Sequence, residues 1–337
     1  MIIYRLPYSS EAIRIDCDSV TRLHSIDDLR GRKGFVMMPY DLESGHDILL
    51  FEGVPQLSSI PAHPAPSYHH PTLATQNPAQ YANAYSTFIK ALEKGEFAKL
   101  VLSRASEWKW IGKEKDLLDA FYRACCLYPR MMIYLVQIPG EGAWMGCTPE
   151  ILVSGSGNHY RTMALAGTMS VPETMPVKNI VWSEKNRKEQ EIVADYIRDC
   201  VSPYARILEE EGPYTSRAGQ LVHLKTEFHL APLQHPTPIT HHLIKNLHPT
   251  PAVCGLPAKE AAAFIRENEG YDRSYYSGVV GMLDEDYETN LFVNLRCGHF
   301  LGEKLTVYGG GGILKDSNLG SEWNETNWKM NTILQTL

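Results

Sequence analysis

The sequence predicts an α+β fold, in which antiparallel or mixed β-sheets are sandwiched and covered by helices. Strand patterns occur in blocks joined by glycine-rich turns, as in residues 144–168, and long amphipathic helical patterns occur in blocks of their own. Strict alternation of single strands and helices would instead indicate a parallel sheet.

The elements follow from residue 1 onward. Residues 1–54 have the pattern of short strands and turns. Residues 55–78 contain six prolines and predict a loop, because proline removes backbone donors. Helical patterns cover residues 81–94, 117–127, 180–208, 258–268 and 321–334. Strand patterns cover residues 100–102, 131–138, 144–168, 304–308 and a hairpin of 275–283 with 291–295.

The length and composition are those of a globular protein. The chain has 337 residues, of which 44% are hydrophobic and 21% charged, and it contains no internal repeat. We expect one domain over residues 1–337, with a variable N-terminal portion, 1–78, and a catalytic core, 79–337.

Charge and cysteine content argue against several classes of protein. The net charge is −7 and no basic stripe is present, so nucleic acid is not an expected partner. Seven scattered cysteines without a CxxC pair indicate neither disulfides nor structural zinc. No signal segment or stretch of ~20 apolar residues is found, so we expect a soluble, cytoplasmic protein without membrane contact. An acidic chain that binds an anion needs local positive charge from arginine, lysine or a metal.

Two ionisable residues lie in apolar strand patterns. Lys99 begins the string KLVLSR, where burial would lower its pKa and suit it to act as a base. Glu150 opens the apolar string EILV, where burial would raise its pKa and suit it to act as an acid. Taken alone, each string favours a strand-end residue that reaches solvent over a catalytic one.

Three glutamates fall on helix faces. Glu189 precedes Ile192 and Val193 by three and four residues and so lies on the apolar face, where a carboxylate needs a cation or an arginine. Glu322, Glu325 and Lys329 share one face of the last helix. That face is either solvated or directed at Glu189, and two inward carboxylates would suit Mg²⁺.

The hairpin and the glycine run form a further group. If Leu283 and Leu291 flank the turn of the expected hairpin, Tyr276 and Arg296 fall on one face of it and could bind a carboxylate together. The glycines at 309–312 allow close approach of a ligand to the backbone, but they match neither the P-loop nor the GxGxxG pattern.

Together these segments resemble the chorismate-utilising enzymes. That family includes isochorismate and salicylate synthases and the large subunits of anthranilate and aminodeoxychorismate synthases. The resemblance runs from about residue 99 to the C-terminus through eight strings in order: KLVLSR, TPEILV, ALAGT, SEKNRKEQ, LHPTPAVCGLP, YYSGVVG, NLRCG and GGGGILKDSNLGSEWNETNWK.

The resemblance implies roles for the matching residues. Lys99 would activate water for attack at C2 of chorismate, and Glu150 would protonate the departing C4 hydroxyl. Mg²⁺ would be held by Glu189 and Glu325, with Glu322 near its waters. The residues implied for substrate binding are Thr168, His223, His248, Ala252, Tyr276, Arg296, Gly310, Gly311, Gly312 and Lys329.

The resemblance also narrows the reaction. Family members that use ammonia have glutamine at the position of Lys99, so lysine indicates water as the nucleophile. The string HPTPAVCGLP resembles that of isochorismate synthases, which feed menaquinone or siderophore synthesis. Salicylate synthase and a non-catalytic chorismate-binding relative stay as alternatives. No glutaminase subunit is expected, and the chain is expected to be a monomer or weak homodimer.

Two residues depart from the family pattern. Gln190 replaces a usual histidine, and Asn186 replaces a usual acidic residue. Either change could weaken magnesium binding, because each lies within one helical turn of Glu189.

Overall fold

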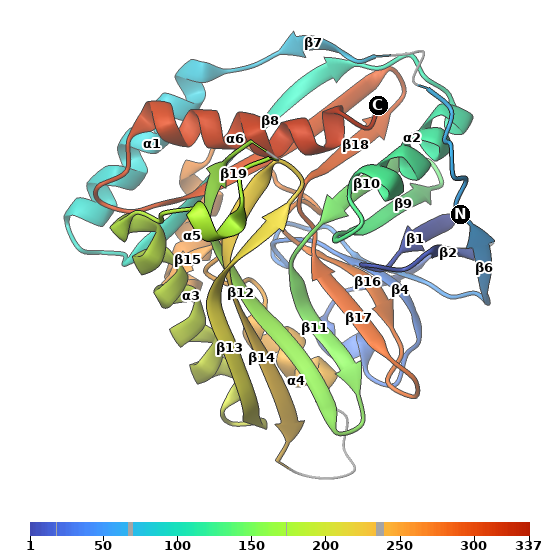
Figure 1. The fold of residues 1–337 in the computed structure, drawn as a ribbon, viewed down its shortest axis with the longest axis horizontal. Helices are drawn as coiled ribbons and strands as arrows, with labels where there is room; N and C mark the ends of the chain where they lie inside the picture. The colour runs from blue at the N-terminus through green and yellow to red at the C-terminus, as the bar shows by residue number, and fades with distance from the viewer. Residues whose placement is uncertain (18, 67–69, 173, 234–238) are drawn as a thin grey trace.

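The computed structural model describes residues 1–17, 19–66, 70–172, 174–233 and 239–337. In these residues two antiparallel sheets, of ten and nine strands, carry the fold, and helices pack around them (Figure 1). This arrangement confirms the predicted α+β class.

The ten-stranded sheet contains strands from both ends of the chain. In sheet order its strands are β15 (Gly255–Leu256), β8 (Lys99–Lys109), β19 (Lys304–Ile313), β18 (Cys297–Leu301), β10 (Gly142–Thr148), β9 (Met132–Ile138), β1 (Ile2–Arg5), β2 (Glu11–Ile15) and β6 (Pro55–Ser59), and β7 (Thr72–Thr75) also pairs with β8. The β8–β19 register sets Gly312 opposite Val101 and Gly310 opposite Ser103. The glycine run therefore lies along the strand that begins with Lys99.

The nine-stranded sheet contains the long hairpins at the bottom of Figure 1. Its strands, in sheet order, are β13 (Ala205–Ala218), β14 (Leu221–Pro232), β12 (His159–Ser170), β11 (Ile151–Ser156), β17 (Thr289–Val293), β16 (Val279–Leu283), β4 (Gly34–Met38), β5 (Ile48–Phe51) and β3 (Thr21–Leu23). Central strands such as β4 and β16 are buried along their whole length, because the other sheet or helices cover both faces.

Helices cover the outer faces. They are α1 (Pro78–Glu93), α2 (Glu114–Leu127), α3 (Glu184–Val201), α4 (Thr240–Leu247), α5 (Ala258–Asn268) and α6 (Leu319–Leu334), with 3₁₀ turns η1 (Ile26–Leu29) and η2 (Val177–Asn179). Helix α3 buries Val193, Ile197 and Val201, the apolar stripe expected of a helix that packs on a sheet. None of the helices in the described part of the chain is long and apolar enough to cross a membrane.

Two expected elements have different bounds. The segment 55–78 was expected to be a loop, but it contains strands β6 and β7; proline is tolerated at the first residue of an edge strand, as at Pro55. Residues 67–69 of that segment lie outside the described residues. The helix expected over 180–208 runs only over Glu184–Val201, because Ser183 caps its start and Pro203 follows its end.

The expected hairpin register is also wrong by two residues. Met282 pairs with Asn290, which makes the turn tighter than a pairing of Leu283 with Leu291. The tighter turn arises because the Asp284 carboxylate accepts hydrogen bonds from the backbone of Asp286 and Tyr287. The hairpin of β13 and β14 was not expected at all.

Candidate active site

A small chamber of about 40 Å³ lies against the glycine run, between the two sheets and α3 and α6. Ten of the residues expected from the sequence line it: Glu150, Thr168, Glu189, His223, Ala252, Tyr276, Arg296, Gly310, Gly312 and Lys329. Lys99, Gly311, Glu322 and Glu325 lie around its edge. Segments more than 200 residues apart in the chain therefore meet at one place.

The chamber exists because the strand beside it has no side chains there. A Cβ at Gly312 would lie 2.1 Å from Glu189 Oε1 and 2.8 Å from Lys99 Cε. A Cβ at Gly310 would lie 2.7 Å from Ser103 Cβ and 3.0 Å from the Tyr276 hydroxyl. Alanine at either position would displace a polar group of the site.

Glu150 is a buried carboxyl group in the short link between β10 and β11. Its side chain is 2% exposed, and Oε1 has no hydrogen-bond partner among the described residues. Burial raises the pKa of Glu150 to about 8, although Lys99, Arg296 and Lys329 act in the opposite direction. At neutral pH this group therefore carries a proton that it can donate.

Lys99 is fully buried at the start of β8 and forms an ion pair with Glu189 of α3. The Lys99 Nζ to Glu189 Oε1 distance is 3.0 Å. Burial by itself would raise the pKa of Glu189, but Lys99, Lys185 and Lys329 outweigh burial and hold the pKa below its usual value. Glu189 is thus an anion on the apolar face of its helix.

Two further lysine–glutamate pairs complete a charged cluster at the edge of the glycine run. Lys185 contacts Glu322 at 2.5 Å, which joins α3 to α6. Lys329 contacts Glu325 at 2.7 Å and donates a second hydrogen bond to the Gly310 carbonyl. Glu189, Glu322 and Glu325 all act electrostatically on Lys185, so the three carboxylates converge on one positive charge.

These carboxylates have the donor chemistry that Mg²⁺ prefers. Glu322 Oε2 is buried without a hydrogen-bond partner in the described chain, and burial, with Glu325 nearby, raises the pKa of Glu322. The described residues hold no ready-made cluster of three or more acidic, histidine or cysteine ligands. The fit to a metal therefore rests on the unpartnered Glu322 Oε2 and on the carboxylate oxygens around it. Lysine side chains balance the negative charge of these carboxylates in the structure.

Arg296 and His223 form the opposite wall. Arg296 Nη2 lies 3.1 Å from His223 Nε2, and His223 Nδ1 lies 3.0 Å from the Gly167 carbonyl. Because arginine only donates, Nε2 accepts and Nδ1 carries the proton. Burial, Arg296 and Lys329 lower the pKa of His223 well below its usual value, which keeps the ring neutral. Arg296 Nε has no partner among the described atoms and is available to an anion.

Tyr276 stands next to the glycine run in the turn before β16. Its ring stacks on Tyr308 with centroids 5.1 Å apart, and Tyr308 stacks in turn on Trp144. Burial raises the pKa of Tyr276 to about 12, so the hydroxyl stays protonated and can donate to a carboxylate.

One expected residue does not reach the chamber. His248 Nε2 lies 3.0 Å from the Tyr40 carbonyl, and His248 is not among the residues that line the cavity. Burial lowers the pKa of His248 to about 4, so the ring is neutral and donates to that carbonyl. His248 instead ties the segment before Ala252 to the loop after β4.

Gln190 and Asn186, the two residues that depart from the family pattern, both contact neighbouring segments of the chain. The Gln190 amide accepts from Ala166 N and donates to the Ala164 carbonyl and to Thr226 Oγ1, so it bonds to strands β12 and β14. The Cβ of Asn186 lies against Gly167, and its backbone N–H donates to the cap residue Ser183.

A supporting ion pair was missed in the sequence. Arg273 and Glu269 are both buried and bond to each other, with a distance of 2.6 Å from Arg273 Nε to Glu269 Oε2. Glu269 accepts from Ser103 N and Oγ, while Arg273 donates to the Val101 and Val253 carbonyls. This pair fixes β8 against the turn that carries Tyr276, and its only sequence signal was an i, i+4 spacing of opposite charges.

The fold is similar to that of solved structures. The chain superimposes on the structure of MenF, the menaquinone-specific isochorismate synthase from Escherichia coli, with a TM-score of 0.82 and 22% identity over 99% of this chain and 88% of that one. The family model described as "Chorismate binding enzyme" matches residues 51–337. The chain belongs to the chorismate-binding enzymes, which confirms the resemblance seen in its sequence.

Curated relatives are similar over a large part of the chain. The vibriobactin-specific isochorismate synthase of Vibrio cholerae is 29% identical over 269 residues, which are 76% of this chain and 66% of that protein. The isochorismate synthase DhbC of Bacillus subtilis is 31% identical over 199 residues, 57% of this chain and 50% of that protein. The matches span half to two thirds of these relatives.

Proposed function

We propose that this chain converts chorismate to isochorismate. The observation that carries the proposal is Glu150, a buried carboxyl that is protonated at neutral pH and lines the same chamber as Arg296, with Lys99 at the chamber's edge. Moving a hydroxyl group from C4 to C2 of the ring requires an acid for the leaving group and a base for the incoming water. The named relatives that are isochorismate synthases support this choice.

Glu150 is the proposed acid. Its proton would pass to the C4 oxygen as that C–O bond breaks, and water would leave. The apolar surroundings favour the neutral form before the reaction, and Lys99, Arg296 and Lys329 stabilise the carboxylate that forms.

Lys99 is the proposed base. It would take a proton from the water that attacks C2, and it must be neutral to do so. Among the described residues it forms an ion pair with Glu189, at 3.0 Å. When bound by Glu189 and Glu325, with Glu322 beside it, Mg²⁺ would supply a Lewis acid for the ring carboxylate and would compete with Lys99 for Glu189.

Hydrogen-bond donors, two of them positively charged, would bind the two carboxylates of the substrate. Arg296 has an open Nε donor, Tyr276 has a hydroxyl donor, and Lys329 extends into the chamber beside Gly310. The backbone of Gly310 to Gly312 allows the ligand to approach, and Thr168, His223 and Ala252 shape the remaining wall. This cluster would supply the local positive charge that a protein of net charge −7 needs in order to bind a dianion.

The product would enter menaquinone or siderophore synthesis, the pathways that the relatives' names give. Because the proposed nucleophile is water, no ammonia-supplying glutaminase subunit is required.

Chromatography of chorismate incubated with the purified protein tests the proposal. We expect isochorismate, formed with Mg²⁺ and not in the presence of a chelator. Salicylate with pyruvate as the main product would identify a salicylate synthase instead. Chorismate that binds without turnover would identify a non-catalytic relative.

A further inference from the structure

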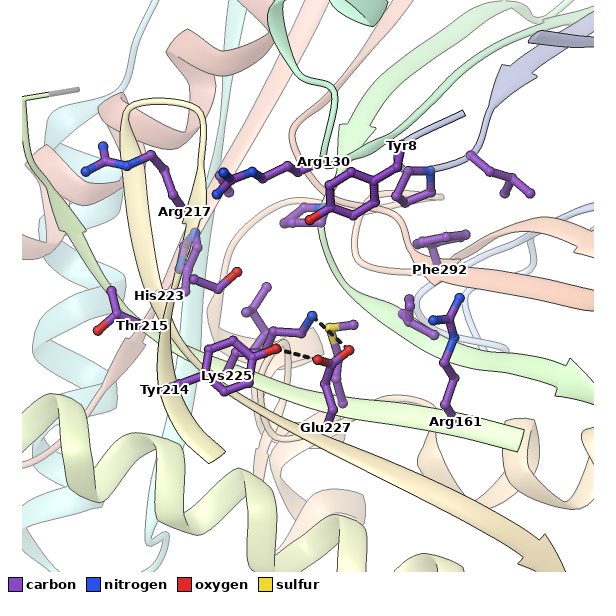
Figure 2. A pocket seen from close by; sticks show the side chains of 18 of the residues that line it. Tyr8, Arg130, Arg161, Tyr214, Thr215, Arg217, His223, Lys225, Glu227 and Phe292 are labelled. Carbon is purple, nitrogen blue, oxygen red and sulfur yellow. Dashed lines mark hydrogen bonds and ion pairs between the residues drawn. The ribbon is translucent and has the colours of Figure 1, made fainter. Parts of the chain in front are cut away.

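A second, larger cavity adjoins the active site. It measures about 430 Å³, and it lies on the face of β11, β12 and β14 that points away from α3 (Figure 2). His223 and Leu165 line both this cavity and the catalytic chamber. Pro149 and Ile151, the two neighbours of Glu150, line it as well. The two spaces therefore share one wall, and none of the roles proposed above uses the larger one.

The cavity has an excess of positive charge. Four basic residues line it, namely Arg130, Arg161, Arg217 and Lys225, against the acidic residues Glu227 and Glu288. Lys225 is neutralised by Glu227 at 2.9 Å, and Glu227 also accepts a hydrogen bond from Tyr214. None of the three arginines forms an ion pair with a described residue, although Arg161 lies close enough to Glu227 to help lower the pKa of that carboxyl.

The arginines also have unused donors. Arg217 donates from Nη2 to the Met175 carbonyl, but its Nη1 is buried without a hydrogen-bond partner in the described chain. In the described part of the chain, Arg161 donates a hydrogen bond from Nε to Ser154 Oγ at 3.3 Å. In Figure 2, Arg130 and Arg217 lie on one side of the cavity and Arg161 lies on the other. The three arginines thus lie on two sides of one space, and in Figure 2 the Arg217 guanidinium, which is bonded to Met175, is turned away from Arg161.

Apolar side chains line the space between these groups. Phe292, Met163 and Leu165 are buried core residues that line it from the sheet. Tyr8 lies at the rim of the cavity (Figure 2). Its backbone has a positive φ of 64°, and the residue is 77% exposed. An apolar ring with a carboxylate at each end matches this distribution of donors and apolar surface.

We propose that this cavity is a second binding site for a cyclic dicarboxylate, the chemical class of the active site's own substrate and product. The choice of ligand class rests on the proposed function, whereas the existence of an anion site rests on the arginines. Arg130 and Arg217 hold one carboxylate and Arg161 holds the other.

Occupation of this site acts on the active site through His223. The His223 ring forms part of the cavity wall, and its Nε2 accepts a hydrogen bond from Arg296, which is directed at the substrate carboxylate. A ligand that moves this ring changes the hydrogen bond to Arg296, so binding in the cavity alters binding in the chamber.

Calorimetric titration with isophthalate, an inert planar dianion, tests the proposal. We compare the unmodified protein with R130A/R217A, with R296A and with a matched control, R206A, which removes an exposed arginine from strand β13 outside the cavity. Isophthalate affinity should fall by roughly tenfold or more in R130A/R217A, since two charge-assisted contacts are lost. It should persist in R206A and R296A. Thermal melts establish that all variants fold.

Two results would overturn the proposal. Isophthalate binding that survives in R130A/R217A but disappears in R296A would place the probe in the catalytic chamber. If R296A binds isophthalate and chorismate cannot displace the bound isophthalate, the proposed ligand class is contradicted. If the unmodified protein forms no isochorismate while isophthalate binding still depends on Arg130 and Arg217, the proposed function fails and the anion site stands.

Discussion

Glu150→Gln should make the protein more stable at neutral and alkaline pH while removing its activity. The carboxyl of Glu150 is 2% exposed and has a pKa raised to about 8 from an ordinary 4.5, chiefly by burial. The folded protein therefore binds this proton more tightly than the unfolded chain does. The stability that the proton contributes is complete below pH 4.5 and is lost as the pH rises through 8.

The size of the effect follows from these two values. Each pH unit between them costs the folded state about 1.4 kcal/mol. Between pH 4.5 and 8 the unmodified protein should therefore lose about 5 kcal/mol relative to a variant whose residue 150 cannot ionise. Glutamine keeps the shape of the protonated carboxyl and cannot become charged, so E150Q isolates this single titration from all others.

Urea unfolding of both proteins at pH 5, 6, 7, 8 and 9, followed by circular dichroism, measures the difference. The free energy of unfolding of E150Q minus that of the unmodified protein should grow steadily with pH and level off above about 8. The same variant should form no isochorismate. Parallel stability curves across this pH range would refute the argument that Glu150 is held protonated by burial.

Three other changes test separate parts of the site. Lys99→Gln should lower isochorismate formation by about 100-fold or more, because glutamine can still bond to Glu189 but cannot accept a proton; a kcat within threefold of normal would exclude Lys99 as the base. Gly312→Ala should reduce turnover by about 100-fold, because its Cβ would lie 2.1 Å from Glu189 Oε1, whereas Gly320→Ala in α6 should preserve the rate. Lys185→Met should lower the free energy of unfolding by about 3 kcal/mol when a chelator is present, because Glu322 would stay buried without its counter-charge. In urea melts, adding Mg²⁺ should restore much of this lost stability. Equal melts with and without Mg²⁺ would argue against a metal at these carboxylates.

Much of the site could be predicted because ionisable residues stood out in apolar patterns. Lys99, Glu150 and Glu189 each interrupt an apolar run, and all three are buried in the structure. The glycine run was informative for a similar reason, since consecutive glycines inside a strand leave room for other groups.

Features that depend on how distant segments meet could not be predicted. No pattern in the helix singled out Lys185, and its pairing with Glu322 exists only because α3 approaches α6. Strand β13 carries exposed polar residues such as Glu209 to Glu211, so no apolar alternation marked it. Strand β14 does alternate, with Leu224, Phe228 and Leu230 buried between less buried polar residues, and that signal was overlooked. The arginine-lined cavity likewise combines residues from distant segments, since Arg130 and Arg217 are 87 positions apart and Tyr8 and Phe292 are 284 positions apart.

The most direct test of the account is the reaction in water enriched in ¹⁸O. Mass spectrometry of the isochorismate formed from chorismate should show one ¹⁸O atom, at the C2 hydroxyl, because the account requires solvent water to attack C2 while the C4 hydroxyl leaves. Isochorismate without the label would contradict a water nucleophile activated by Lys99, and the absence of isochorismate would contradict the proposed function itself.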